Sequence, residues 1–157
     1  MLTFKRLKLA VFGVAWLLLF CVEVGEAQTL RLSVASSVDL GRWVGIGDRE
    51  GITDVCVFNS SGSNYTMTAT AGGSFQLTGG AGSLVYSVSF SDTGSSGVFT
   101  NLPHGSARNF SGADQSSETC GGGFNASVKI AVAEAALGAA RPGNYSGTVT
   151  LTLAAAP

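Results

Sequence analysis

The sequence is poor in charge and in histidine, and each shortage excludes a class of function. Charged residues make up only 12% of the chain, and the net charge is −1 at pH 7. The basic residues after the first ten positions stand singly, so they form no patch for nucleic acid or for an anionic membrane surface. The one histidine, His104, can build neither a metal cluster nor a catalytic dyad alone. We therefore expect no enzymatic activity, no cofactor, no metal site and no nucleic-acid partner.

Two other motifs suggest chemistry but have simpler explanations. Asp48 and Glu50 flank Arg49 between two glycines, which indicates a solvated loop rather than a pair of catalytic carboxylates. The run Gly121-Gly122-Gly123 is not followed by the Gly-Lys-Ser/Thr of a phosphate loop, so it is expected to be a turn beside Cys120.

The first 27 residues have the order of a signal peptide. Lys5, Arg6 and Lys8 precede an apolar stretch from Leu9 to Val22, and the segment ends in Gly-Glu-Ala at Ala27. The apolar stretch is short for a membrane span, and no later stretch approaches that length. We expect export with cleavage after Ala27, which leaves residues 28–157 as one domain.

Two cysteines, Cys56 and Cys120, follow the predicted cleavage site. In an oxidising compartment they can form one intramolecular disulfide. A metal pair or a redox pair is the alternative, but the chain has no Cys-x-x-Cys motif and no cluster of histidines. The sequence therefore predicts a structural disulfide.

Apolar residues alternate with small polar ones along most of the chain, which is typical of half-buried strands. Seven or so short strands with turn-rich links predict an all-β, Greek-key, immunoglobulin-like β-sandwich, with a barrel as the alternative. The segments 54–59 and 65–71 are expected to form a hairpin, and one helical turn is expected within 133–140. Further strands are expected at 29–40 (with a break at Ser36-Ser37), 75–77, 84–90, 124–132 and 145–153, with one or two weak strands between 92 and 119.

Trp43 allows two interpretations. It can cap the core of the sandwich, or it can stack on a sugar in an adhesin. Burial is the simpler explanation, because large aromatic residues dominate small cores.

Several segments together resemble subunits of bacterial chaperone-usher pili. The similarity is to the spore-coat-protein-U-like and alpha-fimbrial colonisation-factor groups, and it covers most of the chain after residue 27. The segments are 43–48 (WVGIGD), 54–58 (DVCVF), 119–126 (TCGGGFNA) and 142–151 (PGNYSGTVTL), the last being the most specific.

The resemblance implies a sandwich that lacks its final strand. The groove left open would have an edge strand carrying Tyr145, Val149, Leu151 and Leu153. In such subunits a periplasmic chaperone first supplies a strand to the groove, and at an outer-membrane usher the N-terminal arm of the next subunit replaces it. The possible donor strand here carries Leu30, Leu32 and Val34.

The expected function is that of a structural fimbrial subunit, minor or tip-associated, which contributes to adhesion. Its expected partners are the chaperone, the usher, other pilus subunits and a host or surface glycan, and its expected location is the periplasm in transit and then the cell surface or the medium. If residues 29–40 are simply the first strand of the fold, the subunit accepts a strand but cannot donate one, which suits a tip position. The alternative is a self-sufficient, secreted, lectin-like or adhesive sandwich that uses loops such as 45–51 or 92–117.

Overall fold

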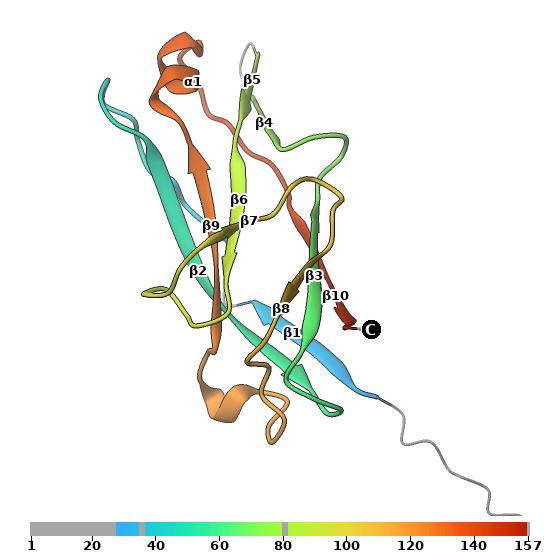
Figure 1. Ribbon diagram of the computed structural model, residues 1–157. Coiled ribbons are helices and arrows are strands. Elements are labelled where there is room, and N and C mark those ends of the chain that lie inside the picture. Colours follow the sequence, from blue (N-terminus) through green and yellow to red (C-terminus); the bar gives the residue numbers. More distant parts are fainter. Residues whose placement is uncertain (1–27, 35–36, 80–81, 157) are drawn as a thin grey trace, which may run out of the picture.

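Two antiparallel sheets face each other in the computed structural model, which describes residues 28–34, 37–79 and 82–156 (Figure 1). The predicted signal peptide at 1–27 lies outside the described residues and, with the boundary at residue 28, stays a prediction. Within the described ranges no helix is long and apolar enough to cross a membrane. The elements are β1 (Leu30–Val34), β2 (Arg49–Asn59), β3 (Tyr65–Thr70), β4 (Gln76–Gly79), β5 (Gly82–Val85), β6 (Ser87–Ser91), β7 (Thr100–Asn101), β8 (Arg108–Phe110), a 3-10 turn (Cys120–Gly122), β9 (Ala126–Val132), α1 (Glu134–Ala139) and β10 (Thr150–Ala155).

The strand order identifies the type of sandwich. One sheet has the order β1-β2-β9-β6-β7, and the other has the order β10-β3-β8, while β4 and β5 pair with each other. An immunoglobulin-like domain places strands A, B, E and D in one sheet and strands C, F and G in the other. The sheet order β1-β2-β9-β6 matches the order A-B-E-D. The pair β3 and β10 in the other sheet matches C and F, and the letters then follow the chain from A (β1) to F (β10). The predicted immunoglobulin-like, all-β fold is confirmed.

The core lies between the sheets because alternate residues of strands such as β3 and β6 point inward. Tyr65, Met67 and Ala69 of β3 are buried, whereas the threonines between them are partly exposed. The Tyr65 ring stacks on Phe110 at 6.0 Å and meets the edge of Phe90 at 6.3 Å between ring centroids. The second half of β2, from Val55 to Asn59, is buried on both faces. It pairs with β1 along one edge, and the Asp114 backbone hydrogen-bonds to it along the other.

The predicted hairpin between 54–59 and 65–71 is wrong. Although β2 and β3 are consecutive, they lie in different sheets, so residues 60–64 cross the sandwich. Asn59 stabilises this crossing: its side chain accepts a hydrogen bond from the Ser61 N–H at 3.1 Å and donates one to the Asn64 carbonyl at 2.9 Å. A five-residue link with turn residues looks the same in sequence whether it joins paired strands or opposite sheets.

Other predicted boundaries need correction. The first strand ends at Val34, and residues 37–48 belong to no strand. The expected loop at Asp48–Glu50 is partly wrong, since β2 already begins at Arg49. The strand at 84–90 is divided at Tyr86 into β5 and β6, which belong to different sheets. The helical turn and the two weak strands, α1, β7 and β8, are confirmed.

Candidate functional site

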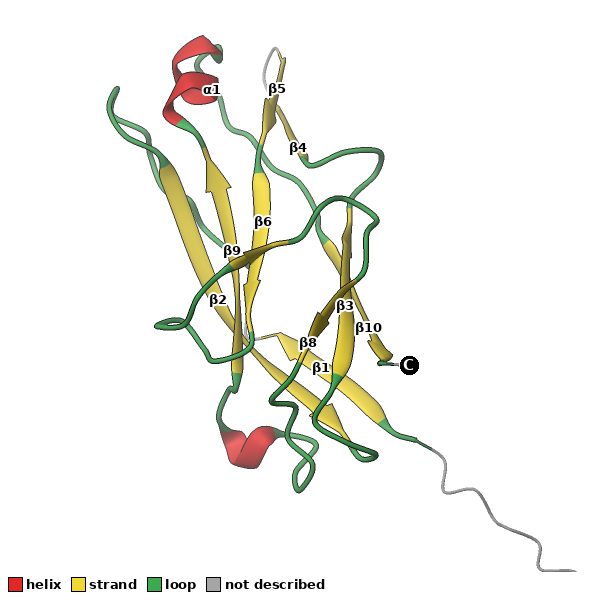
Figure 2. Cartoon of the chain, in the orientation of Figure 1, coloured by secondary structure: helices red, strands yellow, loops and turns green. Residues whose placement is uncertain are grey.

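The two main sheets end side by side in strands that do not pair with each other. β1 is the last strand of the five-stranded sheet and β10 is the last strand of the three-stranded sheet, and the two strands are neighbours (Figure 2). Within the described residues no ladder joins them, and β10 pairs only with β3. The sandwich is therefore open along this side.

The segment that follows β1 extends the same side of the sandwich. Val38 and Leu40 pack against the core, although their backbone belongs to no sheet. They lie directly over β2, where a Cβ built on Gly51 would come within 2.3 Å of the Val38 side chain. Gly51 thus gives the segment room to lie against the sheet.

The open side is apolar and incompletely covered. Along β10, Leu151 and Leu153 face inward and are partly buried, whereas Thr150 and Thr152 are exposed. Such an alternation next to an unpaired backbone edge is the surface that a further strand would cover. The partly buried residues on this side that pack against the core are Leu32, Val38, Leu40, Tyr145, Val149, Leu151 and Leu153.

The four predicted edge residues do not all lie in one strand. Leu151 and Leu153 belong to β10, but Tyr145 and Val149 precede it. Ser146, between them, forms a separate bridge to Thr78 of β4, with hydrogen bonds in both directions at 2.8 and 2.9 Å. The Tyr145 hydroxyl donates to the Arg141 carbonyl at 2.7 Å.

The glycine of β4 explains why the chain changes partner there. A Cβ built on Gly79 would lie 1.8 Å from the Asn144 carbonyl oxygen, so only glycine allows this approach. The predicted edge is therefore built from two segments. The segment around Ser146 pairs with β4, and β10 pairs with β3.

The possible donor residues Leu30, Leu32 and Val34 lie in β1, which pairs with β2 in antiparallel register from Leu30↔Asn59 to Val34↔Val55. Just before the strand, Thr29 and Ser60 exchange hydrogen bonds at 2.9 and 3.0 Å. In the structure these residues form the first strand of the chain's own sheet, and their use as a donor stays a prediction.

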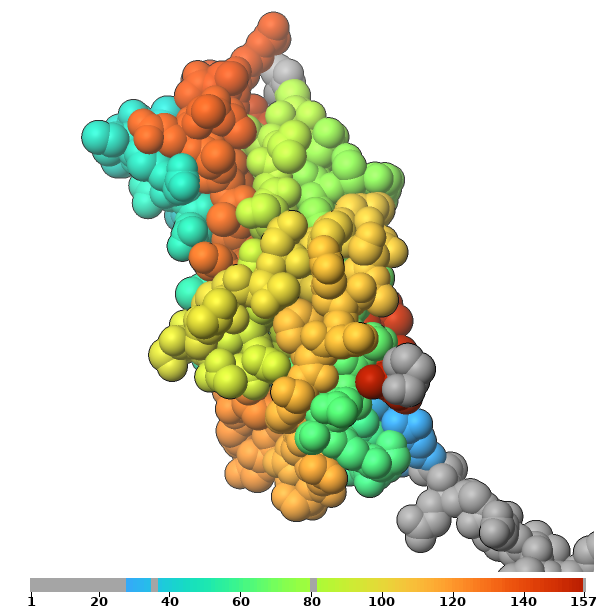
Figure 3. All heavy atoms as spheres, in the orientation of Figure 1, coloured from blue at the N-terminus to red at the C-terminus, as the bar shows by residue number. Residues whose placement is uncertain are grey.

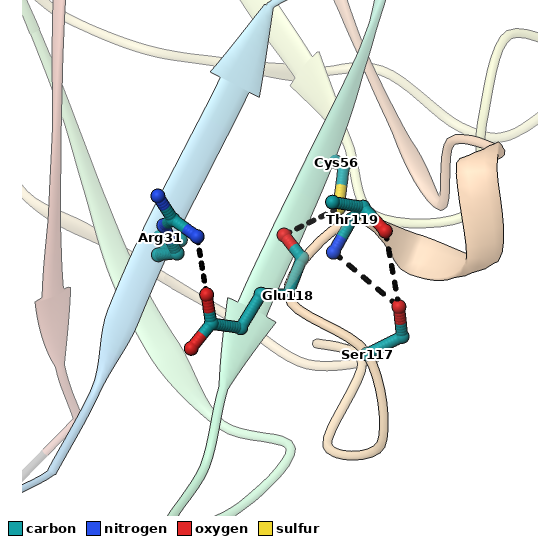
Figure 4. A network of polar contacts seen from close by, with 5 residues as sticks. All are labelled: Arg31, Cys56, Ser117, Glu118 and Thr119. Atoms are coloured by element: carbon teal, nitrogen blue, oxygen red, sulfur yellow. Dashed lines mark hydrogen bonds and ion pairs between the residues drawn. The ribbon is translucent and has the colours of Figure 1, made fainter.

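The predicted disulfide between Cys56 and Cys120 is confirmed, and it fixes a loop against β2. Figure 4 shows Glu118 of this loop reaching Arg31 of β1 in an ion pair, while its carbonyl faces the Cys56 sulfur. The Ser117 hydroxyl contacts both the N–H and the hydroxyl of Thr119. The covalent bond and the ion pair therefore connect β1, β2 and the loop at one end of the sandwich.

Asp114 begins this loop and shapes its turn. Hydrogen bonds from the backbone and hydroxyl of Ser116, followed by the backbone of Ser117, lower the pKa of the Asp114 carboxyl. Its backbone also bonds with Val57 and Asn59 of β2. The Asp114 carboxylate thus stabilises the turn at 114–117, and the Asp114 backbone fixes that turn to β2.

Trp43 lies outside the core. It is partly buried, its indole N–H donates to the Gly47 carbonyl at 2.9 Å, and its ring lies against Gly138 of α1. It therefore closes the loop at 43–47 onto the helix. Val44 and Ile46 in that loop are 73% and 75% exposed.

Val38 and Leu40 also lie on the open side, as partly buried residues that pack against the core. Their alternation continued that of the first strand, so they were expected to be part of it. The signal that separates them is the pair Ser36-Ser37, beyond which the same parity resumes.

No family model and no curated protein matches the sequence. Among solved structures, a chain from one titled "Chaperone-tip adhesin complex is vital for synergistic activation of CFA/I fimbriae biogenesis" aligns with 81% of this chain, with a TM-score of 0.54 and 18% sequence identity. The chain described here spans 42% of the length of that chain. At this identity the similarity is one of fold, and it agrees with the β-sandwich derived above.

Proposed function

We propose that this chain is a fimbrial subunit whose sandwich is completed by a strand from another protein. The observation that carries the proposal is the position beside β10. In an immunoglobulin-like sheet strand G pairs with strand F, and β10, which corresponds to F, has no neighbour there among the described residues. The G position is empty, and the core is partly exposed beside it.

An edge of this kind favours a partner for two physical reasons. The free N–H and C=O groups of β10 can form a ladder with an added strand, and alternate apolar side chains of that strand can fill the gap over Leu151 and Leu153. Left uncovered, the same edge is a template for aggregation. A subunit of this type therefore needs a companion from export until assembly.

The proposed partners follow from this need. A periplasmic chaperone would cover the edge in transit, and a neighbouring subunit would replace it at an outer-membrane usher. The similarity to a chain of a chaperone-tip adhesin complex supports partners of these two kinds and an adhesive role at the cell surface. In this proposal β1 stays paired with β2, which suits a tip-associated or minor subunit that accepts a strand.

The test uses the purified chain that begins at residue 28 and a short synthetic peptide of alternating apolar and polar residues. A control peptide has the same composition, but its apolar residues are grouped in pairs, so they cannot all face one side of a strand. We expect the alternating peptide to raise the melting temperature and to protect the amides of β10 from hydrogen exchange.

The alternative is the self-sufficient adhesive module. The strand-acceptor proposal is wrong if the free chain is monomeric, if its β10 amides are already protected from hydrogen exchange, and if the alternating peptide changes neither property. The independent module is then the better account. Equal stabilisation by both peptides would also count against it, since the proposed edge recognises alternation.

A further inference from the structure

One end of the sandwich presents two exposed aliphatic side chains. Val44 and Ile46, in the loop at 43–47, are 73% and 75% exposed. Figure 3 shows this loop in teal, α1 in orange and the β4–β5 hairpin in green, lying together at one end of the molecule. In Figure 2 the 3-10 turn lies at the opposite end. The loop contains no charged residue, so it offers an apolar surface to a partner.

The loop is held in shape by the elements beside it. Trp43 closes it through the hydrogen bond to the Gly47 carbonyl and lies against α1. The Asp48 carboxylate accepts a hydrogen bond from the Glu134 N–H, at the start of α1, at 2.8 Å. Because the backbone is fixed in this way, a partner that covers Val44 loses little conformational entropy in the loop.

A series of contacts connects this loop to the open edge. The Trp43 ring lies against α1, α1 contacts β5, and β5 pairs with β4. Thr78 of β4 pairs in turn with Ser146, shortly before β10 begins. At its other end β10 finishes with Ala155, which pairs with Tyr65 directly after the link at 60–64. The loop and the start of β10 therefore belong to the same end of the sandwich.

The direction of an added strand decides which end its partner occupies. Strand G of an immunoglobulin-like sheet is antiparallel to strand F, so a strand added beside β10 begins near Ala155 and ends near Thr150. A partner whose domain follows its donated strand is thereby brought to the end that carries Val44 and Ile46. A partner whose domain precedes the strand is brought to the end with the 3-10 turn, near Phe124, which is 53% exposed. The more exposed aliphatic pair favours the first arrangement.

We infer that the loop at 43–47, together with α1 and the β4–β5 hairpin, is the surface that the domain of the strand-donating subunit contacts. The donated strand is then an N-terminal arm, because only an arm that precedes its own domain brings that domain to this end. Val44 and Ile46 pack against apolar side chains of the donor, since the loop has no charge for a polar surface to match. The inference rests on the proposed function and adds the polarity and the position of the partner.

The first test measures the direction of the added strand by NMR. The alternating peptide carries a nitroxide label at its C-terminal or at its N-terminal residue, and each form is added to the isotope-labelled chain that begins at residue 28. We expect the C-terminal label to broaden the amide signals of residues 146–150, and the N-terminal label to broaden that of Ala155. The opposite pattern would overturn the inference but leave the proposed function intact, whereas a peptide that does not bind beside β10 would refute both.

The second test locates the donor's domain in fimbriae assembled by the cells that produce this chain. A photo-crosslinking residue replaces Thr152 in one variant, to capture the donated strand, and Val44 in another. We expect both to capture the same protein, with the residues captured from position 44 later in its sequence than those captured from position 152. Val98 is the matched control: it is 85% exposed but lies between β6 and β7, and the same replacement there should not capture that protein.

The inference is wrong if position 152 captures a strand while position 44 captures nothing or a different protein. The double variant Val44→Ser/Ile46→Ser then measures what the two side chains contribute. It should leave the melting temperature and the affinity for the alternating peptide unchanged, because both side chains are exposed. It should lower the crosslinked yield from position 152 about tenfold, as loss of an interface anchor does. An unchanged yield would also count against this surface.

Discussion

Removal of the disulfide should cost this fold a large part of its stability. The bond joins Cys56 in β2 to Cys120, which are separated by 64 positions. The loop that it closes contains β3 to β8, and thus most of the sheet that faces β2. For a loop of this length, the loss of unfolded-state entropy corresponds to about 4 kcal/mol at 25 °C. Domains of this size are typically stable by roughly 5–15 kcal/mol, so we expect the double variant Cys56→Ala/Cys120→Ala to fold but only marginally.

Urea unfolding followed by far-UV circular dichroism measures the effect. The wild type with reductant should match the double variant, and reductant should leave the variant unchanged. Arg31→Ala is the control for the ion pair in the same region, and it should cost less than about 1 kcal/mol because Arg31 and Glu118 are both largely exposed. A loss below about 1 kcal/mol in the double variant would refute the loop-closure argument for this protein.

Three further predictions address the edge, the packing and the core. Leu153→Ala should weaken binding of the alternating peptide about fivefold, since the added strand buries the rest of that side chain, whereas the exposed Thr152→Ala should leave the dissociation constant unchanged. Gly79→Ala should destabilise the fold by about 2 kcal/mol because the new Cβ meets backbone, while Gly72→Ala, with open space around it, should cost less than about 0.5 kcal/mol in the same urea assay. Burial, and after it the charge of Asp92, raise the pKa of the Tyr65 hydroxyl, so the unfolded chain loses this proton at a lower pH than the folded chain. The free energy of unfolding should therefore fall as the pH rises above about 10, and Tyr65→Phe should make this fall less steep.

The strands and the fold class were predictable from the sequence because both depend on local alternation. The residues of β3 show this most clearly, with Tyr65, Met67 and Ala69 buried and the threonines between them outside. The disulfide was predictable by counting, since only two cysteines follow the predicted cleavage site. Neither inference requires knowledge of which strand pairs with which.

The sequence could not predict which strands pair with each other. The alternation of β2 and β3 is the same whether residues 60–64 make a hairpin or cross between sheets, because both need the same turn residues. Similarly, one run of alternating residues at 84–90 became two strands in different sheets. The difference depends on distant neighbours such as β9, which separates β2 from β6.

The candidate site was predictable only in part for the same reason. Leu151 and Leu153 could be placed on an inward face from their parity, and the structure places them beside an unpaired edge. The predicted break at Ser36-Ser37 separated Val38 from Leu30–Val34, but the sequence could not show that the segment after the break belongs to no sheet.

The open edge beside β10 and the closed side beside β8 lie at opposite edges of the same small sheet, and this has a consequence for assembly. The sheet has the order β10-β3-β8, so a strand added beside β10 is separated from β8 by the width of the sheet. On the β8 side, the Ser111 N–H just after β8 donates a hydrogen bond to Asp92 just after β6, and this bond connects the two sheets. Strand addition beside β10 should therefore leave the hydrogen bond between Ser111 and Asp92 in place.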